Sequence, residues 1–366
     1  MKKNLQLALA LMLGFATTVS AQDWSVDSRS RINMSGDNDR FETEQRVRVG
    51  TSFGGDDWAV HVSSDLNYNV GVNTSIANQP NDVTATLHEA FATANLFGYD
   101  FSVGRQALEF GNGSIIGAND WGKTAYTRDG FTASMEFSGT DVTLFGGSRT
   151  NNGVEGAVDY GSGSYIGANA SGEMSGFGYN VVYISQSRQL AAEESEESAM
   201  GLDISYSTMG ANLTFSYNTV DLGTDMDHNY YTAGVEYPVN DQLTVEAKMT
   251  QYSDDGFGLT GTNTGVNDDV NNSWNTHGNM GYLDGGDQMM SFGGSYDMGD
   301  FSVGVSMHQV TNEDYDANWE RNVTMLDLGY KLGNNSSFSL MYATDDNRAN
   351  AEVEETYMFA TLRIGL

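Results

Sequence analysis

Two pairs of arginines near the start of this sequence have the spacing of an anion-binding surface. Arg29 and Arg31 lie two positions apart, as do Arg46 and Arg48. Such spacing puts both members of a pair on one face of a β-strand, because successive side chains point to opposite faces. If the two segments form a hairpin in which paired residue numbers sum to about 75, Arg29 lies opposite Arg46. The sequence therefore predicts a wall rich in guanidinium groups.

Carboxylates are expected on the same face. The pairing places Asp27 opposite Arg48. It also places Glu44 opposite Arg31, and closure of a barrel would bring Arg363 beside them. One interpretation is a basic stripe that guides an anionic solute along the wall. The other is a lattice of salt bridges that stiffens the wall and neutralises itself, since exposed ion pairs are common and contribute little energy.

Hydrolytic chemistry would need a serine, a histidine and an acid in one arrangement, and no such pattern stands out around the five histidines. His61 and His308 share the parity of polar neighbours, whereas a barrel phospholipase needs its Ser–His pair on the lipid face. The chain has no cysteine, which excludes disulfide scaffolds, thiolate zinc sites and cysteine nucleophiles. We therefore expect a protein that is not an enzyme and has no cofactor or metal.

The charge balance excludes another class of partner. The chain has 49 acidic and 17 basic side chains, for a net charge of −32. Nucleic-acid binding needs a cationic face, so we expect no nucleic-acid partner.

The first residues predict export. Lys2 and Lys3 are followed by an apolar stretch over 7–16, and Val19-Ser20-Ala21 ends in the pattern that signal peptidases cleave. We expect a signal peptide over 1–21 and a single domain over 22–366; a buried N-terminal helix is the alternative. After Ala21 no run of 18 apolar residues occurs, so no helix is expected to span a membrane.

Strands of about ten residues fill the rest of the chain, and their connections alternate in length. Eight short connections, such as 97–99 and 209–210, alternate with nine longer ones, such as 111–127, 189–197 and 253–286. This pattern predicts an all-β fold, a transmembrane antiparallel up-and-down β-barrel of about 18 strands. Such barrels lie in the outer membrane of Gram-negative bacteria, among lipid and lipopolysaccharide.

The two strand faces differ in polarity. In the first strand Trp24, Ile32 and Met34 share one parity, while the charged residues share the other. The charged set is too large for a dry core, so it is expected to face a wet lumen and the apolar set to face lipid. The last strand alternates in the same way up to Leu366. It resembles the C-terminal targeting strand of outer-membrane proteins, which implies recognition by the barrel-assembly machinery.

The segment from Val103 through Gly104-Arg105-Gln106 to Asp129-Gly130-Phe131 carries the most distinctive motif. Together with the preceding His88-Glu89, it resembles the alginate export family of outer-membrane β-barrel porins over about residues 86–132. The resemblance implies an 18-stranded pore with a loop folded over or into it. It assigns six residues to this loop and the strands that hold it: Arg105, Gln106, Asp120, Trp121, Arg128 and Asp129.

Arg105 presents a conflict of parity. Strict alternation puts Arg105 on the face of Phe101 and Val103, which would be the lipid face. Either a β-bulge near Gly104 shifts the register, or Arg105 lies near the interface and extends its charge toward water. We expect the bulge.

The expected function is an outer-membrane porin for passive diffusion of small hydrophilic, including anionic, solutes. The residues expected to line the pore are Arg29, Arg31, Arg46, Arg48, Arg105, Gln106, Asp120, Arg128, Asp129 and Arg363. The alternative is a non-conducting structural or adhesive barrel that binds partners or divalent cations through acidic outer loops. Those loops include a glutamate run over 193–197 and the loop with Asp268 and Asp269, whose spacing fits no 12-residue calcium loop.

Overall fold

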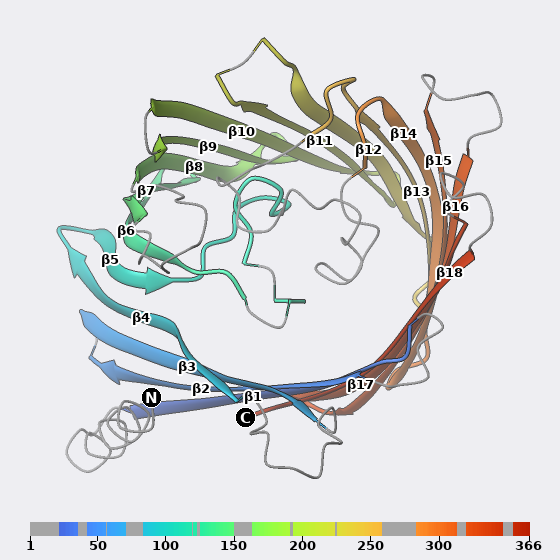
Figure 1. Ribbon diagram of the computed structural model, residues 1–366, viewed down its shortest axis with the longest axis horizontal. Coiled ribbons are helices and arrows are strands. Elements are labelled where there is room, and N and C mark those ends of the chain that lie inside the picture. The colour runs from blue at the N-terminus through green and yellow to red at the C-terminus, as the bar shows by residue number, and fades with distance from the viewer. Residues whose placement is uncertain are drawn as a thin grey trace.

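The chain forms one closed barrel of antiparallel strands, shown end-on in Figure 1. The computed structural model describes residues 22–366 apart from 36–41, 56, 71–82, 119, 123–124, 150–162, 191–192, 224, 258–282, 313–319 and 347–353. The expected signal peptide over 1–21 lies outside the described residues, as do Asp268 and Asp269. None of the described residues forms a helix long and apolar enough to cross a membrane.

The barrel has 18 strands, as the alternating connections predict. They are β1 (Gln22–Asn33), β2 (Glu42–Gly54), β3 (Trp58–Val70), β4 (Thr84–Leu96), β5 (Tyr99–Gln106), β6 (Arg128–Phe137), β7 (Thr140–Arg149), β8 (Gly163–Met174), β9 (Phe177–Leu190), β10 (Glu193–Thr208), β11 (Ala211–Asp221), β12 (His228–Pro238), β13 (Leu243–Tyr252), β14 (Asp287–Asp297), β15 (Phe301–Asn312), β16 (Glu320–Gly333), β17 (Ser336–Asp346) and β18 (Glu354–Gly365).

Each strand pairs with its neighbours in the chain, and β1 closes the barrel by pairing with β18. The β1–β2 register places Arg29 opposite Arg46 and Arg31 opposite Glu44, which confirms the expected pairing. The β1–β18 register places Arg363 opposite Arg29. Three arginines therefore lie side by side across the seam of the barrel.

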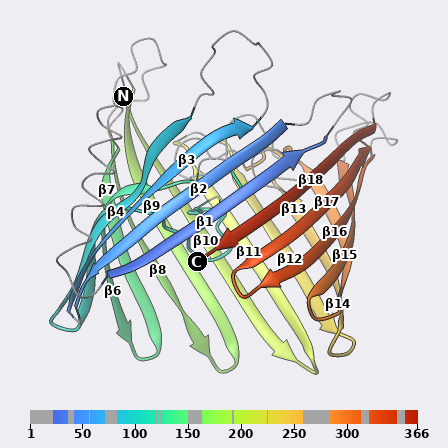
Figure 2. The ribbon, with the colours of Figure 1, turned by 90° about the horizontal axis from the view of Figure 1, so that it is seen from below.

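Short turns gather at one end of the barrel, at the bottom of Figure 2. Four of them are two-residue turns in which a non-glycine residue and a glycine both have positive φ, as at Phe97-Gly98 and Met209-Gly210. Two successive positive φ angles define the type I′ turn, whose twist matches that of the paired strands. The glycine that each of these turns requires is visible in the sequence, which is why the short connections can be predicted.

One expected long connection is wrong. Residues 189–197 are predicted to form an outer loop, but β9 extends to Leu190 and β10 begins at Glu193. Glu197 is buried in β10 and accepts a hydrogen bond of 2.6 Å from Gln186 Nε2. The cross-strand amide satisfies this carboxylate, so Glu197 can lie buried in a strand.

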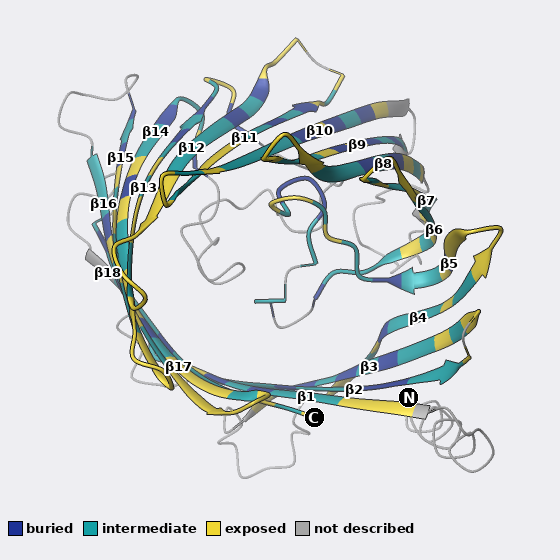
Figure 3. Cartoon of the chain, turned by 180° about the vertical axis from the view of Figure 1, so that it is seen from behind, coloured by how far each residue is buried: buried dark blue, intermediate teal, exposed yellow. Residues whose placement is uncertain are grey.

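Buried, intermediate and exposed residues occur along the same strands (Figure 3), and burial differs between the two parities. Trp24 is 44% exposed on the outside, whereas Arg29 on the opposite parity is 4% exposed. This inversion of the soluble pattern is what a membrane barrel requires, since lipid takes the place of an apolar core.

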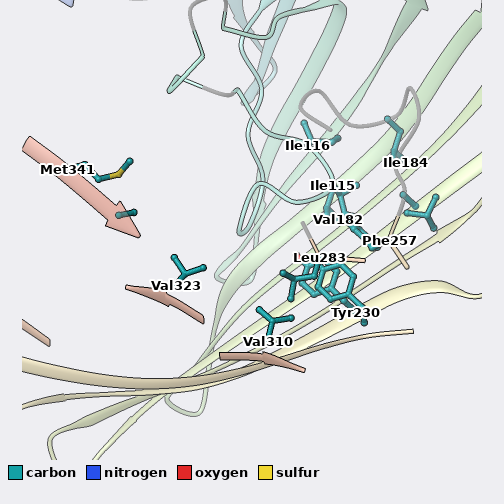
Figure 4. Packing of buried hydrophobic residues seen from close by; sticks show 14 of the residues in the cluster. Ile115, Ile116, Val182, Ile184, Tyr230, Phe257, Leu283, Val310, Val323 and Met341 are labelled. Atoms are coloured by element: carbon teal, nitrogen blue, oxygen red, sulfur yellow. The ribbon is translucent and has the colours of Figure 1, made fainter. Parts of the chain in front are cut away.

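Apolar side chains nevertheless cluster inside the barrel (Figure 4). Ile115 and Ile116 are 1% and 0% exposed and belong to the same buried cluster as Val182 and Ile184 of β9. Because Ile115 and Ile116 come from the connection between β5 and β6, that connection is packed inside the barrel against its wall.

Candidate functional site

The connection between β5 and β6, residues 107–127, lies in the interior of the barrel (Figure 1); we call it the inward loop. Its first half folds back on itself through a bridge between Phe110 and Ile116, with Phe110 N donating to Ile116 O at 3.0 Å. Its second half returns through Tyr126 N, which donates to Ala118 O at 2.7 Å. These internal bonds give the loop a defined shape before any contact with the wall.

Two arginines of the wall bind the backbone of the inward loop. Arg29 donates to the carbonyl oxygens of Asp120, Trp121 and Gly122 at 2.6, 2.8 and 2.9 Å. Arg46 donates to the Asp120 carbonyl at 3.2 Å and to its Oδ1 at 2.8 Å. Guanidinium groups carry several donors in one plane, so two side chains can satisfy a whole turn of loop carbonyls.

Aromatic contacts reinforce this attachment. The Arg31 guanidinium carbon lies 3.6 Å from the centre of the Trp121 ring, a cation–π contact. The edge of Trp121 meets Phe359 of β18 at 5.5 Å between ring centres. Trp121 is therefore held between an arginine of β1 and an aromatic ring of β18.

Carboxylates neutralise the remaining arginines. Arg363 forms two hydrogen bonds with Asp27, at 2.9 and 3.0 Å, and lies 2.9 Å from Asp120 Oδ2. Arg48 forms two with Asp65, at 2.7 and 3.0 Å. We call Arg29, Arg31, Arg46, Arg48 and Arg363 the arginine cluster. Its contacts favour the salt-bridged interpretation over an open basic stripe.

Asp120 is the acidic centre of this arrangement. Burial raises the pKa of Asp120, but the opposing effects of Arg46 and Arg363 dominate and hold the pKa below its ordinary value of 3.8. The charged form is thus the form that binds the arginine cluster. Sequence reasoning placed both Asp120 and the arginines near the pore but missed that they bind one another, since nothing in strand periodicity locates a loop residue.

The other side of the inward loop is bound to the opposite wall. Phe110 stacks on Phe145 of β7 at 5.1 Å between ring centres. Ser114 Oγ shares a buried hydrogen bond with Tyr230 Oη of β12. Asp203 of β10 accepts a hydrogen bond from Asn112 N at 3.0 Å. The loop therefore crosses the lumen and is held at both ends.

Gly111 permits the close approach to β10. It has a φ of +58°, and a Cβ at this position would lie 2.1 Å from Asp203 Oδ2 and 2.7 Å from Asn180 Oδ1. Any side chain would push the loop off the wall, so the glycine-rich character of the motif has a steric cause.

Arg105 and Asp129 lie apart from the other candidates. They pair across β5 and β6 with two bonds of 2.7 and 2.6 Å. Their parity is that of Val103 and Phe131, which are 62% and 44% exposed on the outside of the wall. The structure thus puts this ion pair on the outer face, in contrast to the expected pore-lining position.

The expected bulge near Gly104 is wrong. Pairing of β4 with β5 runs without a shift from Ala90–Arg105 to Leu96–Tyr99. Gly104 instead has a φ of +134°, and a register shift of the neighbouring β3–β4 pair lies between Ser63 and Ser64. Asp129 neutralises Arg105 on the outer face of the wall. The arginine therefore does not need a register shift that would turn it toward the lumen.

Gln106 and Arg128 lie on the inner face of the wall. They pair across β5 and β6 on the parity of buried Ser102 and Thr132. Arg128 lies over the ring of Tyr165, 5.3 Å from its centre. Of the ten candidates, eight therefore lie on the lumen side or in the inward loop.

One histidine contact was missed in the sequence. His61 Nδ1 lies 2.9 Å from Ser52 Oγ, and its Nε2 lies 3.4 Å from Glu89 Oε2. These are the residue types of a nucleophile, base and acid. Ser52, however, pairs with both β1 and β3, so the backbone amides around it belong to the sheet and do not form an oxyanion site. Glu89 also accepts a hydrogen bond from Ala107 N at 2.9 Å, which places it at the base of the inward loop.

A cavity of about 1060 Å³ remains between the inward loop and strands β7 to β14. Its walls are polar and aromatic, with carboxylates from Glu109, Asp141 and Asp203 and rings from Tyr126 and Tyr179. Over the residues that the structure describes, no three His, Asp or Glu side chains form a group able to hold a metal ion. The cavity is therefore suited to binding or passage of a polar solute.

An 18-stranded barrel narrowed by an inward loop has the fold of outer-membrane porins. Solved structures with this fold include Pseudomonas aeruginosa OccK5 (OpdH), with a TM-score of 0.67 at 11% identity over 95% of this chain and 98% of that chain. OccD3 (OpdP) of the same organism gives 0.64 at 15% over 95% and 92%. OccK2 (OpdF), solved with glucuronate, gives 0.64 at 10% over 95% and 98%. No family model and no curated protein matches the sequence.

Proposed function

We propose that this protein is an outer-membrane channel through which small hydrophilic solutes diffuse passively. The observation that carries the proposal is the inward loop, which is bound to opposite walls and leaves a polar cavity of about 1060 Å³ beside it. A barrel filled by the side chains of its own strands would need no such loop. A wide pore without a constriction would not select among solutes. A loop held inside the lumen sets a pore size.

Location in the outer membrane of a Gram-negative bacterium belongs to this proposal, as does removal of a signal peptide over 1–21. An outside rich in apolar side chains supports contact with lipid and lipopolysaccharide. The alternating faces of β18 support recognition by the barrel-assembly machinery. A passive channel needs no enzyme chemistry.

The contacts of the arginine cluster do not support an anionic solute. OccK2 was solved with glucuronate, a carboxylate, but in this chain the cluster binds loop carbonyls and carboxylates of its own. We therefore propose hydrophilic solutes without extending the resemblance over 86–132 to alginate.

The test is single-channel recording of the protein purified from outer membranes and inserted in a planar bilayer. Discrete open steps of stable amplitude are expected. Folded protein that carries no current would overturn the proposal and favour a structural or adhesive barrel. The observation that favours a structural or adhesive barrel is the burial of Ile115 and Ile116 inside the lumen.

A further inference from the structure

The inference concerns the charge of the solutes and rests on the proposed channel function. We infer that the lumen selects small cationic solutes, because the arginine cluster is bound to the inward loop while carboxylates face the remaining cavity.

The basic wall is largely neutralised, because the five arginines of the cluster lie among four carboxylates, Asp27, Glu44, Asp65 and Asp120. Arg29, Arg31 and Arg46 are 4%, 4% and 1% exposed, so a passing solute barely reaches them. Arg48 and Arg363 are more exposed, at 20% and 46%, but each forms two hydrogen bonds with one carboxylate. Their charges are therefore cancelled at close range, and the field they project into the lumen is small.

The cavity, by contrast, is lined by more acidic than basic side chains. Glu109, Asp141 and Asp203 line it together with Asp120, which the arginine cluster already neutralises. Lys248 is the single Lys or Arg among the described residues that line it. Three carboxylates against one ammonium leave the cavity with a net negative charge.

Asp203 is held in place by two hydrogen bonds. Its Oδ1 accepts a hydrogen bond of 2.6 Å from Ser216 Oγ, and its Oδ2 accepts one of 3.0 Å from Asn112 N. Both donors are neutral, so they orient and stabilise the carboxylate without cancelling its charge. Asp203 lies where the inward loop meets β10, at the edge of the space left for a solute.

Aromatic rings complete a surface that suits a cation. Tyr126 of the inward loop and Tyr179 of β9 both line the cavity. The faces of such rings carry negative charge density and attract ammonium groups. Charged groups set in low-dielectric walls also concentrate counter-ions, which makes a few carboxylates effective in a narrow lumen.

The test is the zero-current potential of the purified protein in a planar bilayer with a tenfold KCl gradient, repeated with choline chloride. The expected result is a potential of the sign that K⁺ and choline permeation produces. Combined Asp141→Asn and Asp203→Asn substitutions should lower the ratio of K⁺ to Cl⁻ permeability by about two-fold or more. Lys248→Gln should raise it.

Asp241→Asn is the control, because it removes an exposed carboxylate from the short turn between β12 and β13, outside the cavity, and should leave the ratio unchanged. The Asp203→Asn amide keeps an oxygen that can accept from Asn112 N, so the loop contact survives. Open channels that prefer Cl⁻, or a ratio unchanged in the lumen variants, would overturn the inference and leave the channel function intact. Folded protein without current would overturn both.

Discussion

Arg46 and Asp120 lie 74 positions apart in the chain, yet Arg46 Nη2 is 2.8 Å from Asp120 Oδ1. The contact joins the wall at β2 to the inward loop, and Arg46 is 1% exposed beneath it. The space left inside the barrel therefore depends on a side-chain contact as well as on the number of strands.

Replacement of Arg46 should release the inward loop. Arg46→Met removes the ion pair with Asp120 and one of the two donors to the Asp120 carbonyl, which Arg29 still binds. The expected cost to the bound position of the loop is about 1 to 3 kcal/mol. Single-channel recordings should show larger and noisier open steps. Arg321→Met is the control, since Arg321 forms a comparable two-bond pair with Asp345 within the wall. Equal noise in both variants would contradict the role given to Arg46.

Acid should release the loop for the same reason. The pKa of Asp120 lies below 3.8, because the arginine cluster outweighs the effect of burial. A lowered pKa stabilises the bound loop above pH 3.8, and this contribution is lost as the pH falls through the lowered value.

Current fluctuations should therefore increase when the bilayer solutions are taken from pH 7 to below pH 3.8. In Asp120→Asn the charged partner is absent at every pH, so fluctuations should be high throughout and change little. A wild-type trace that is unaffected by acid would show that the loop is held without the Asp120 carboxylate, by its carbonyl contacts and by its contacts with the opposite wall.

Much of the fold follows from patterns of short range. Two-residue alternation gives the faces, and turn residues such as Phe97-Gly98 give the short hairpins. Arg29 lies opposite Arg46 across a longer connection, where the shared face of the two arginine pairs is the signal. The site follows only in part, because the inward loop has no period that would place Asp120 beside the arginines. Arg105 was misplaced since its partner, Asp129, lies on the next strand.

Gly104 should be more sensitive to substitution than Gly98, a turn glycine that also has positive φ. At Gly104 an added Cβ would lie 2.2 Å from the Ala90 carbonyl oxygen, whereas at Gly98, with a φ of +84°, it would meet nothing within 4 Å. Gly98→Ala should cost about 1 kcal/mol from backbone strain alone. Gly104→Ala adds a clash with β4 and should cost more. Urea unfolding in lipid vesicles measures the difference, and equal losses would show that β4 and β5 move apart freely.

The outer-face pair of Arg105 and Asp129 should behave as one unit. Both side chains lie on the outer face of the wall. An unpaired arginine that faces lipid costs up to about 2 to 4 kcal/mol at the membrane centre. Asp129→Leu should therefore destabilise the barrel, because it leaves Arg105 without its partner. Arg105→Leu combined with Asp129→Leu removes both charges and should recover much of that loss. The double-mutant cycle, measured by unfolding in lipid vesicles, should give a coupling of about 1 kcal/mol or more. Additive effects of the two substitutions would mean that water, rather than lipid, surrounds the pair.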